Sequence, residues 1–415
     1  MKDVKKLVLA LVVIALLGCS TAQAEVVGTQ AAAEATELII WHQWAGDYYE
    51  TIQYSIARYD LDRPNLQISL APAQTNLTDL PVGNFPADRG PDVIVWANDR
   101  IGELAEAGDI VPLDDYDLDR DQLLETYSSV SVRGVTYQRQ VWALPETEEG
   151  IALLVNREAI DPARFPNNPT DLTAVLALAE DYYEENGGEK ALICNQGLGG
   201  VDAYHVAPIF FGFGMPEYVD EQGNTYLTSP EGLAAAEWIA ALRQVSMERS
   251  SYNGCLSAFL TGEVAAWWTG PWSIAALEEA NLDFTIIPMG RPFVGIKSVM
   301  LTQLALDRGH AEEALAFMQY YTSAEVQADL AQLNKTIPAA QAALENPAVQ
   351  AAATVATFSA ALRDGVPLSN SPYAAQQWDP IGEAVLAIWR AELTPESALE
   401  QAQAEILAAF SGDSD

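Results

Sequence analysis

Residues 90–113 read GPDVIVWANDRIGELAEAGDIVPL, and this stretch decides the fold class. A Gly-Pro-Asp turn leads into Val93–Trp96, a continuous apolar run of strand length, and a helix follows until a glycine ends it. A strand that passes directly into a helix is typical of a parallel sheet with helices on its faces. Such sheets bind ligands beyond the carboxyl ends of their strands, which is where Trp96, Asp99 and Arg100 lie.

The same alternation continues along the chain. Apolar runs predict strands at 37–41, 66–70, 191–195 and 293–301, and helical periodicity predicts helices at 47–59, 172–183, 312–333 and 381–410. Two further strands, 141–145 and 151–155, are predicted to flank an acidic connector, 146–149. With 49% hydrophobic residues and this length, we predict an α/β protein of two domains.

The first residues indicate export. Lys2, Lys5 and Lys6 precede an uncharged apolar run, 7–17, which is too short to span a bilayer. The run ends in Leu-Leu-Gly-Cys19, which resembles a bacterial lipobox, where the thiol is acylated and the preceding segment is removed. We therefore expect 1–18 to be a signal peptide and Cys19 to carry the lipid.

The alternative is an ordinary signal peptide that is cut near Ala22–Ala24. Both readings export the protein, and the first one anchors it on the outer face of the cytoplasmic membrane. Residues 19–36 then form a flexible tether, since they contain no aromatic residue and no clear apolar period. We expect no other contact with the membrane.

Charge excludes one class of partner. The chain has 58 acidic and 21 basic residues and a formal net charge of −37. Such a charge repels nucleic acids and anionic lipid surfaces. Because the acidic residues are interspersed, we interpret them as a solvated folded surface and not as an acidic tail.

The sequence offers little catalytic machinery. Its three histidines, His42, His205 and His310, form no metal-binding pair at helical spacing, and no phosphate-binding loop or serine-nucleophile motif is present. Glu146, Glu148 and Glu149 are near enough to suggest a glycosidase pair, but carboxylates also accept hydrogen bonds from sugar hydroxyls. We expect no enzymatic activity and no cofactor.

Tryptophan gives the positive indication. Of ten tryptophans, Trp96, Trp272 and Trp378 lie at the ends of predicted elements. A sugar presents apolar faces and a belt of hydroxyls, so its site needs flat aromatic rings with polar groups at their edges. Each tryptophan taken alone fits a core position equally well, but nearby Asp, Arg and Glu residues favour a site.

At these residues the sequence resembles a known family, the sugar-binding proteins of bacterial ABC importers, and within it the maltose and maltodextrin-binding group. The resemblance is carried by 90–113, by VWALPETEEGIALLVNREAI at 141–160, by GEVAAWWTGPWSIAAL at 262–277 and by RPFVGIKSVM at 291–300. It covers nearly everything from Leu38 onward, in the order of the family.

The resemblance implies the two-lobed periplasmic-binding-protein fold, with a ligand cleft between lobes that hinge crossings join near Glu146–Gly150, Phe293–Ser298 and Thr336–Ala340. Lobe 1 would be 37–147 plus about 299–335, and lobe 2 would be 148–298 plus about 336–415. The implied function is that of a monomer that binds a maltodextrin-like sugar and delivers it to the permease subunits of an ABC importer. A secreted glycan-processing enzyme and a sugar-sensing surface lipoprotein remain the alternatives.

The resemblance also implies roles for individual residues. Trp96, Trp272 and Trp378 resemble its aromatic platforms. The polar contacts would be Asp99, Arg100, Glu149, Asn195, Asp202, Tyr204 and Asp47. One departure concerns ligand identity: the position where the maltose-binding group carries an arginine is Gly382 here.

Two cysteines remain after Cys19. Cys194 ends a predicted strand and Cys255 begins a helix. An exported protein meets an oxidising compartment, where an even pair of thiols usually forms a disulfide. We predict this bond, with two separate buried thiols as the alternative. The resemblance places both cysteines in lobe 2.

Overall fold

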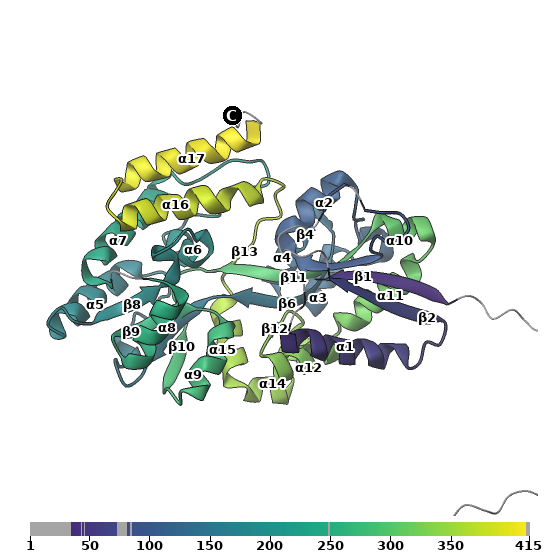
Figure 1. Ribbon diagram of the computed structural model, residues 1–415, viewed down its shortest axis with the longest axis horizontal. Coiled ribbons are helices and arrows are strands. Elements are labelled where there is room, and N and C mark those ends of the chain that lie inside the picture. Colours follow the sequence, from purple (N-terminus) through teal and green to yellow (C-terminus); the bar gives the residue numbers. More distant parts are fainter. Residues whose placement is uncertain are drawn as a thin grey trace, which may run out of the picture. The chain divides into compact units, whose positions relative to one another are not determined.

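Two main β-sheets organise the protein. The computed structural model describes residues 35–42, 44, 46–72, 81–83, 85–247 and 250–411 (Figure 1). The larger sheet consists of β1 (Thr36–His42), β2 (Leu66–Pro72), β3 (Val93–Ala97), β6 (Leu144–Gly150), β11 (Phe293–Leu301), β12 (Ile337–Pro338) and β13 (Val366–Pro367). Its strand order is β12-β6-β11-β3-β1-β2, and β13 pairs with β11.

The larger sheet is mixed. β1 pairs in parallel with β2 and with β3, as the strand-helix alternation predicts. β11 is antiparallel to both β3 and β6, so the prediction of a parallel sheet holds only for one half. The reason is that β6 takes the chain out of this sheet and β11 brings it back, so the two strands run in opposite directions.

The acidic segment 146–149 belongs to strand β6, and its prediction as a connector is wrong. β6 lies between β11 and β12, which pair with its backbone. Glu146 is fully buried and accepts a hydrogen bond from Tyr321 Oη at 2.7 Å. Glu148 is also buried and accepts one from Ser131 Oγ at 2.8 Å. Because these partners come from other parts of the chain, local sequence could not reveal a buried acidic strand.

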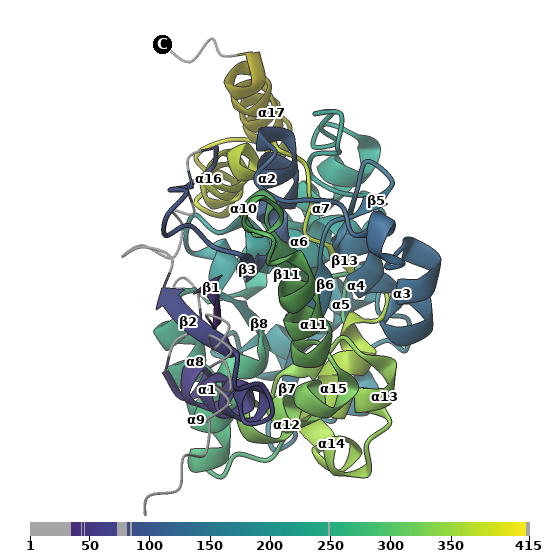
Figure 2. The same cartoon turned by 90° about the vertical axis from the view of Figure 1, so that its right-hand side faces the viewer.

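The helices around the larger sheet cover its faces and one end. They are α1 (Gly46–Asp60), α2 (Ile101–Ala107), α3 (Arg120–Thr126), α4 (Ser129–Gly134), α10 (Gln303–Arg308), α11 (Ala311–Tyr321), α12 (Ala324–Asn334), α13 (Gln341–Leu344), α14 (Pro347–Ala351) and α15 (Ala353–Leu362). The predicted helix 312–333 is divided in two, because Ser323 caps the start of α12. Figure 2 shows α12 to α15 gathered beside one another.

The smaller sheet is built from segments that follow β6. Its strands are β7 (Ala152–Asn156), β8 (Ala191–Asn195), β9 (Val264–Thr269) and β10 (Phe284–Ile287), in the order β10-β7-β9-β8. Its helices are α5 (Leu172–Glu185), α6 (Ala203–Gly212), α7 (Pro230–Leu242), α8 (Tyr252–Thr261) and α9 (Ile274–Glu279). A separate hairpin pairs β4 (Thr136–Tyr137) with β5 (Gln140–Val141).

The last two helices return to the smaller sheet. α16 (Trp378–Trp389) and α17 (Pro395–Ser411) pack on each other, and both contact α7 (Figure 1). The predicted helix 381–410 is therefore two helices. No helix in the described ranges is long and apolar enough to cross a bilayer.

Each sheet with its helices forms one lobe of the predicted two-lobed α/β fold. The chain passes between the sheets where β7 follows β6, where β11 follows β10 and again between β13 and α16. The predicted lobe boundaries at 147/148 and 298/299 fall inside β6 and β11, which belong to the larger sheet along their whole length. These boundaries stay a prediction.

Candidate ligand-binding site

A cavity of about 530 Å³ lies between the larger sheet and the segment that follows β9. This volume is typical of a small-molecule site. Its walls are Thr147, Glu148, Glu149, Pro271, Trp272, Ile274, Ala275, Glu278, Lys297, Leu333, Asn334, Lys335, Thr336 and Ile337. The structure therefore brings two predicted contacts, Glu149 and Trp272, to the same space from distant parts of the sequence.

Trp272 owes its position to the Gly-Pro that precedes it. Pro271 begins a short 3₁₀ helix, where its fixed φ is favourable and its missing N–H is not needed. A Cβ on Gly270 would lie 2.1 Å from the Trp272 ring, so only glycine lets the indole fold over this backbone. The side chain remains 40% exposed, which is unusual for a tryptophan in a folded protein and suits a surface that stacks on a ligand.

Asp202 precedes α6, and His205 holds its carboxylate. Its Oδ1 accepts a hydrogen bond from the backbone N–H of His205 at 3.0 Å, and its Oδ2 lies 2.7 Å from His205 Nδ1. Burial alone would raise the pKa of the Asp202 carboxyl, but the hydrogen bonds and charge of His205 outweigh it and lower that pKa. Asp202 is thus an ionised acceptor with a fixed orientation.

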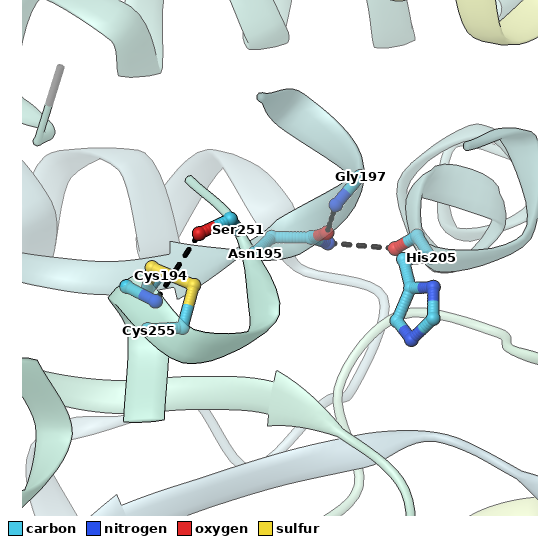
Figure 3. The surroundings of a disulfide bond; sticks show 7 residues. Cys194, Asn195, Gly197, His205, Ser251 and Cys255 are labelled. Carbon is cyan, nitrogen blue, oxygen red and sulfur yellow. Dashed lines mark hydrogen bonds between the residues drawn. A yellow bond between two sulfur atoms is a disulfide. The ribbon is translucent and has the colours of Figure 1, made fainter. Parts of the chain in front are cut away.

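Asn195 ends β8 and is fully buried. Its Nδ2 donates to the carbonyl of His205 at 2.6 Å, and its Oδ1 accepts from the N–H of Gly197 at 2.9 Å. Figure 3 shows the amide between these two groups, with the imidazole ring of His205 pointing away from it. Because both ends of the amide are used inside the fold, Asn195 fixes the segment that carries His205.

Aromatic rings form a continuous series between two of the predicted platforms. Trp378 lies 5.6 Å from Phe293, and Phe293 stacks on Tyr204 at 6.2 Å between ring centroids. Tyr204 contacts the ring of His205 at 5.3 Å, and His205 meets Trp272 edge-on at 5.9 Å. Tyr204, Trp272 and Trp378 are thus joined by two residues that the sequence had not suggested as contacts.

The negative charge of Glu149 affects Tyr204, a member of this aromatic series. Burial, assisted by the charges of Glu149 and Asp202, raises the pKa of the Tyr204 hydroxyl well above its usual range. Tyr204 therefore stays a neutral hydrogen-bonding group near two carboxylates. Glu149 itself is exposed to the cavity, whereas Glu148, its neighbour in β6, is buried.

The predicted contacts on the larger sheet lie at the carboxyl end of β3. Trp96 is only 3% exposed and packs in the core. Strand register places Ala97 beside Lys297, a residue of the cavity wall, so the short 3₁₀ helix Asn98–Arg100 begins next to the cavity.

Asp99 and Arg100 differ in their surroundings. Burial raises the pKa of Asp99 to about 6, although the neighbouring Arg100 opposes this shift. Asp99 Oδ1 is buried and has no hydrogen-bond partner in the part of the chain that the structure describes. Arg100 forms an ion pair with Glu103, with Nη2 and Oε2 2.7 Å apart. Asp47 belongs to α1, but its side chain lies outside what the structure describes.

Sequence reasoning missed several residues of this site. His205 was set aside as one of three isolated histidines, and Phe293 was taken only as the start of a strand. Lys297 and Lys335 both line the cavity. They are two of only three lysines after residue 6, and this scarcity was the one signal that could have singled them out.

The comparisons with known proteins agree with this geometry. Residues 73–357 match the model of a family described as bacterial extracellular solute-binding protein. The chain belongs to this family. As a member of an extracellular family, this solute-binding protein is exported.

Similar proteins support the fold and the class of the molecule. The maltotriose-binding protein of Pyrococcus abyssi is 25% identical over 391 residues, which are 91% of this chain and 83% of the relative. The galactooligosaccharide-binding protein of Bacillus subtilis is 20% identical and covers 90% of this chain and 89% of its own. A solved cyclo/maltodextrin-binding protein in complex with maltotetraose has a TM-score of 0.75 at 21% identity, and covers 92% of this chain and 99% of its own.

The three cysteines of this solute-binding protein have different places. Cys194 and Cys255 form the predicted disulfide, with sulfurs 2.03 Å and Cα atoms 5.6 Å apart (Figure 3). It ties β8 to α8 beside Asn195. Cys19, the predicted lipid carrier, lies outside the described residues. No group of three or more His, Cys, Asp or Glu side chains within those residues is arranged to hold a metal ion.

Proposed function

We propose that this protein captures a maltodextrin-like oligosaccharide between its lobes and delivers it to the permease subunits of an ABC importer. The observation that carries this proposal is the convergence of Glu149 and Trp272 on one cavity next to the aromatic series. Flat rings beside fixed carboxylates match the apolar faces and hydroxyl edges of a sugar. The names of the similar proteins, which bind maltotriose, galactooligosaccharides and maltodextrins, support the same class of ligand.

We assign the parts of the site as follows. Trp272, Trp378 and Tyr204 stack on sugar rings, and Glu149 and Asp202 accept hydroxyl protons. Asn195 acts indirectly, because its hydrogen bonds hold the segment that carries Asp202 and His205. The ligand contacts on the side of the larger sheet come from Trp96, Asp99, Arg100 and Asp47. Closure of the lobes on the ligand would then create the surface that the permease prefers, and the protein would act as a monomer.

We further propose that the site binds its ligand without reacting with it. Two of the three carboxylates that suggested a glycosidase serve the fold, because Glu146 and Glu148 are buried and hydrogen-bonded to Tyr321 and Ser131. Of these three carboxylates only Glu149 stays exposed, so this cluster does not supply the pair that hydrolysis of a glycosidic bond ordinarily uses.

The test is a calorimetric titration of the mature protein with maltotriose, a galactooligosaccharide and glucose. We expect saturable binding of at least one oligosaccharide, and an unchanged ligand after prolonged incubation, as judged by chromatography. The absence of heat with every oligosaccharide contradicts the binding proposal, and product formation contradicts the proposal that the protein is not an enzyme.

We also propose that Cys19 anchors the protein. In cells, Cys19→Ser should release the protein from the membrane fraction, because an acyl chain is the attachment that the sequence offers. Wild-type protein is the matched control. Continued sedimentation of the serine variant with membranes contradicts the lipid anchor.

A further inference from the structure

We propose that His205 is a specificity-determining contact of the sugar: its Nε2 accepts a hydrogen bond from a ligand hydroxyl, while its Nδ1 holds Asp202. This inference rests on the proposed function, and it adds to the site a residue that neither the sequence pattern nor the comparisons assign.

The position of His205 is the first argument. Its ring lies edge-on between Tyr204 and Trp272, at 5.3 Å and 5.9 Å between centroids. Its Nδ1 lies 2.7 Å from Asp202 Oδ2. Three residues proposed to bind the sugar therefore surround one imidazole, which is 8% exposed. His205 is not itself part of the cavity wall, and its link to the cavity is its contact with Trp272.

The second argument is the state of the two ring nitrogens. An ionised carboxylate can only accept a hydrogen bond, so the nitrogen beside Asp202 carries the proton. The proposal concerns the neutral ring, in which Nε2 is then an acceptor. Both ring nitrogens are buried: Nδ1 has the Asp202 carboxylate 2.7 Å away as an ion-pair neighbour, and Nε2 has no partner in the described part of the chain. A buried polar atom without a partner costs about 1 to 3 kcal/mol, so its retention calls for an explanation.

A sugar hydroxyl provides that explanation. It can donate to Nε2 while its ring stacks on Trp272, because the imidazole stands edge-on to the indole. A hydroxyl that is held this way discriminates strongly, since a ligand without it leaves the buried nitrogen unpaired. If His205 served only as packing, a phenyl ring in its place would keep both aromatic contacts and bind sugar equally well.

Three variants separate these roles, with maltotriose as the probe. His205→Asn keeps an amide near the Nδ1 position, so it can still hold Asp202, but it loses Nε2. His205→Gln reaches the Nε2 position and loses Nδ1, and His205→Phe keeps only the ring. We expect the Asn and Phe variants to bind maltotriose about tenfold more weakly and the Gln variant to recover most of the affinity. Wild-type affinity in the Asn variant overturns the proposal, as does a Gln variant that binds more weakly than Asn.

The structure offers a matched control. His310 also lies beside an aspartate, with Nδ1 3.2 Å from Asp92 Oδ1, but it precedes α11, which packs against α10, α12 and β11 of the larger sheet. His310→Asn should therefore leave maltotriose affinity unchanged. An equal loss in this control shows that the loss at His205 is a general effect on the fold and overturns the proposal.

A ligand-side experiment uses only the wild-type protein and the His205→Phe variant. Monodeoxy and monofluoro maltotrioses remove the hydroxyl proton at one position at a time. We expect one position at which both analogues bind wild type about tenfold more weakly, and at which the Phe variant shows no further loss. If wild type binds maltotriose, but the loss at every hydroxyl position is the same in wild type and in the Phe variant, the inference fails while the proposed function stands. If wild type binds no oligosaccharide, the proposed function itself fails.

Discussion

Gly382 of α16 packs directly on the backbone of Asp202. A Cβ at Gly382 would lie 2.7 Å from the amide nitrogen of Asp202 and 2.9 Å from the carbonyl carbon of Val201. No side chain fits this contact without moving the segment that presents Asp202 to the site. An arginine, which the resemblance implies at this position in the maltose-binding group, would not fit this packing.

Gly382→Ala should consequently weaken both the fold and the site. We expect the free energy of unfolding to fall by about 1 to 3 kcal/mol, as for other overpacked positions. Maltotriose affinity should also fall, because Asp202 is displaced. Urea unfolding and calorimetry measure the two effects.

Gly200 provides the control for this change. It lies in the same loop, and a Cβ there meets nothing within 4 Å. Gly200→Ala should therefore change neither stability nor affinity appreciably. If the two variants had the same free energy of unfolding and the same maltotriose affinity, the contact at Gly382 would explain neither property.

The aromatic platforms give a second prediction. Trp272→Ala and Trp378→Ala should each weaken maltotriose binding by about 1 to 3 kcal/mol, since each removes a large apolar face. Trp142 is also partly exposed, but its Nε1 donates to the carbonyl of Tyr137 at 3.0 Å in the β4–β5 hairpin, and it belongs neither to the cavity wall nor to the aromatic series of Trp272 and Trp378. Trp142→Ala should leave binding intact, and unchanged binding in both platform variants contradicts the stacking role.

Strands with continuous apolar runs could be predicted from sequence. The predicted strands 191–195 and 293–301 agree with β8 and β11 at both ends. Their side chains are buried on one or both faces, so hydrophobicity alone marks them. β6 could not be predicted, because its carboxylates are buried by partners such as Tyr321 that local sequence does not reveal.

The site could be predicted in part. Trp272 stands out because Gly-Pro precedes it, and its 40% exposure agrees with that local reasoning. Trp96 has a similar position at the end of a strand, yet it is 3% exposed, because burial depends on what packs across the sheet. His205 escaped notice because its role depends on three neighbours, and only the folded chain brings Trp272 to it.

Asp99 gives a prediction about pH. Burial raises the pKa of Asp99 to about 6, and its proposed role requires the ionised form. Protonation competes with sugar hydroxyls for the carboxylate, so maltotriose affinity should fall as pH drops through about 6. In Asp99→Asn the affinity should be weaker at pH 7.5, and its fall through about pH 6 should be smaller than in wild type. A wild-type affinity that is flat between pH 7.5 and 5 contradicts this role.

A rise in pH should have the opposite effect on the contribution of Asp99 to stability. Its pKa is higher in the folded chain than the ordinary value of 3.8, so the folded state binds more protons between about pH 4 and 6. The contribution of Asp99 to stability therefore falls as pH rises through that window. Comparison of urea unfolding of wild type and Asp99→Asn isolates this contribution from those of other acidic groups. A difference that does not change with pH would contradict the raised pKa.

The disulfide gives the last prediction. Cys194 and Cys255 are 61 residues apart in sequence, and closing a loop of that length stabilises a fold by about 4 kcal/mol in the chain-entropy model. Cys255→Ala should lower the free energy of unfolding by roughly this amount, and Cys194→Ala should lower it equally, because either change removes the same bond.

Sugar affinity should survive the loss of the bond. Asn195 is held through its own hydrogen bonds to His205 and Gly197, so the segment that carries Asp202 keeps its support. We expect maltotriose affinity within about twofold of wild type in either variant, as long as the protein is folded. Thiol titration of the denatured, unreduced Cys19→Ser protein should detect no free thiol. Two free thiols in that titration would rule out the bond, and an unfolding free energy that neither variant lowers would show that it contributes nothing to stability.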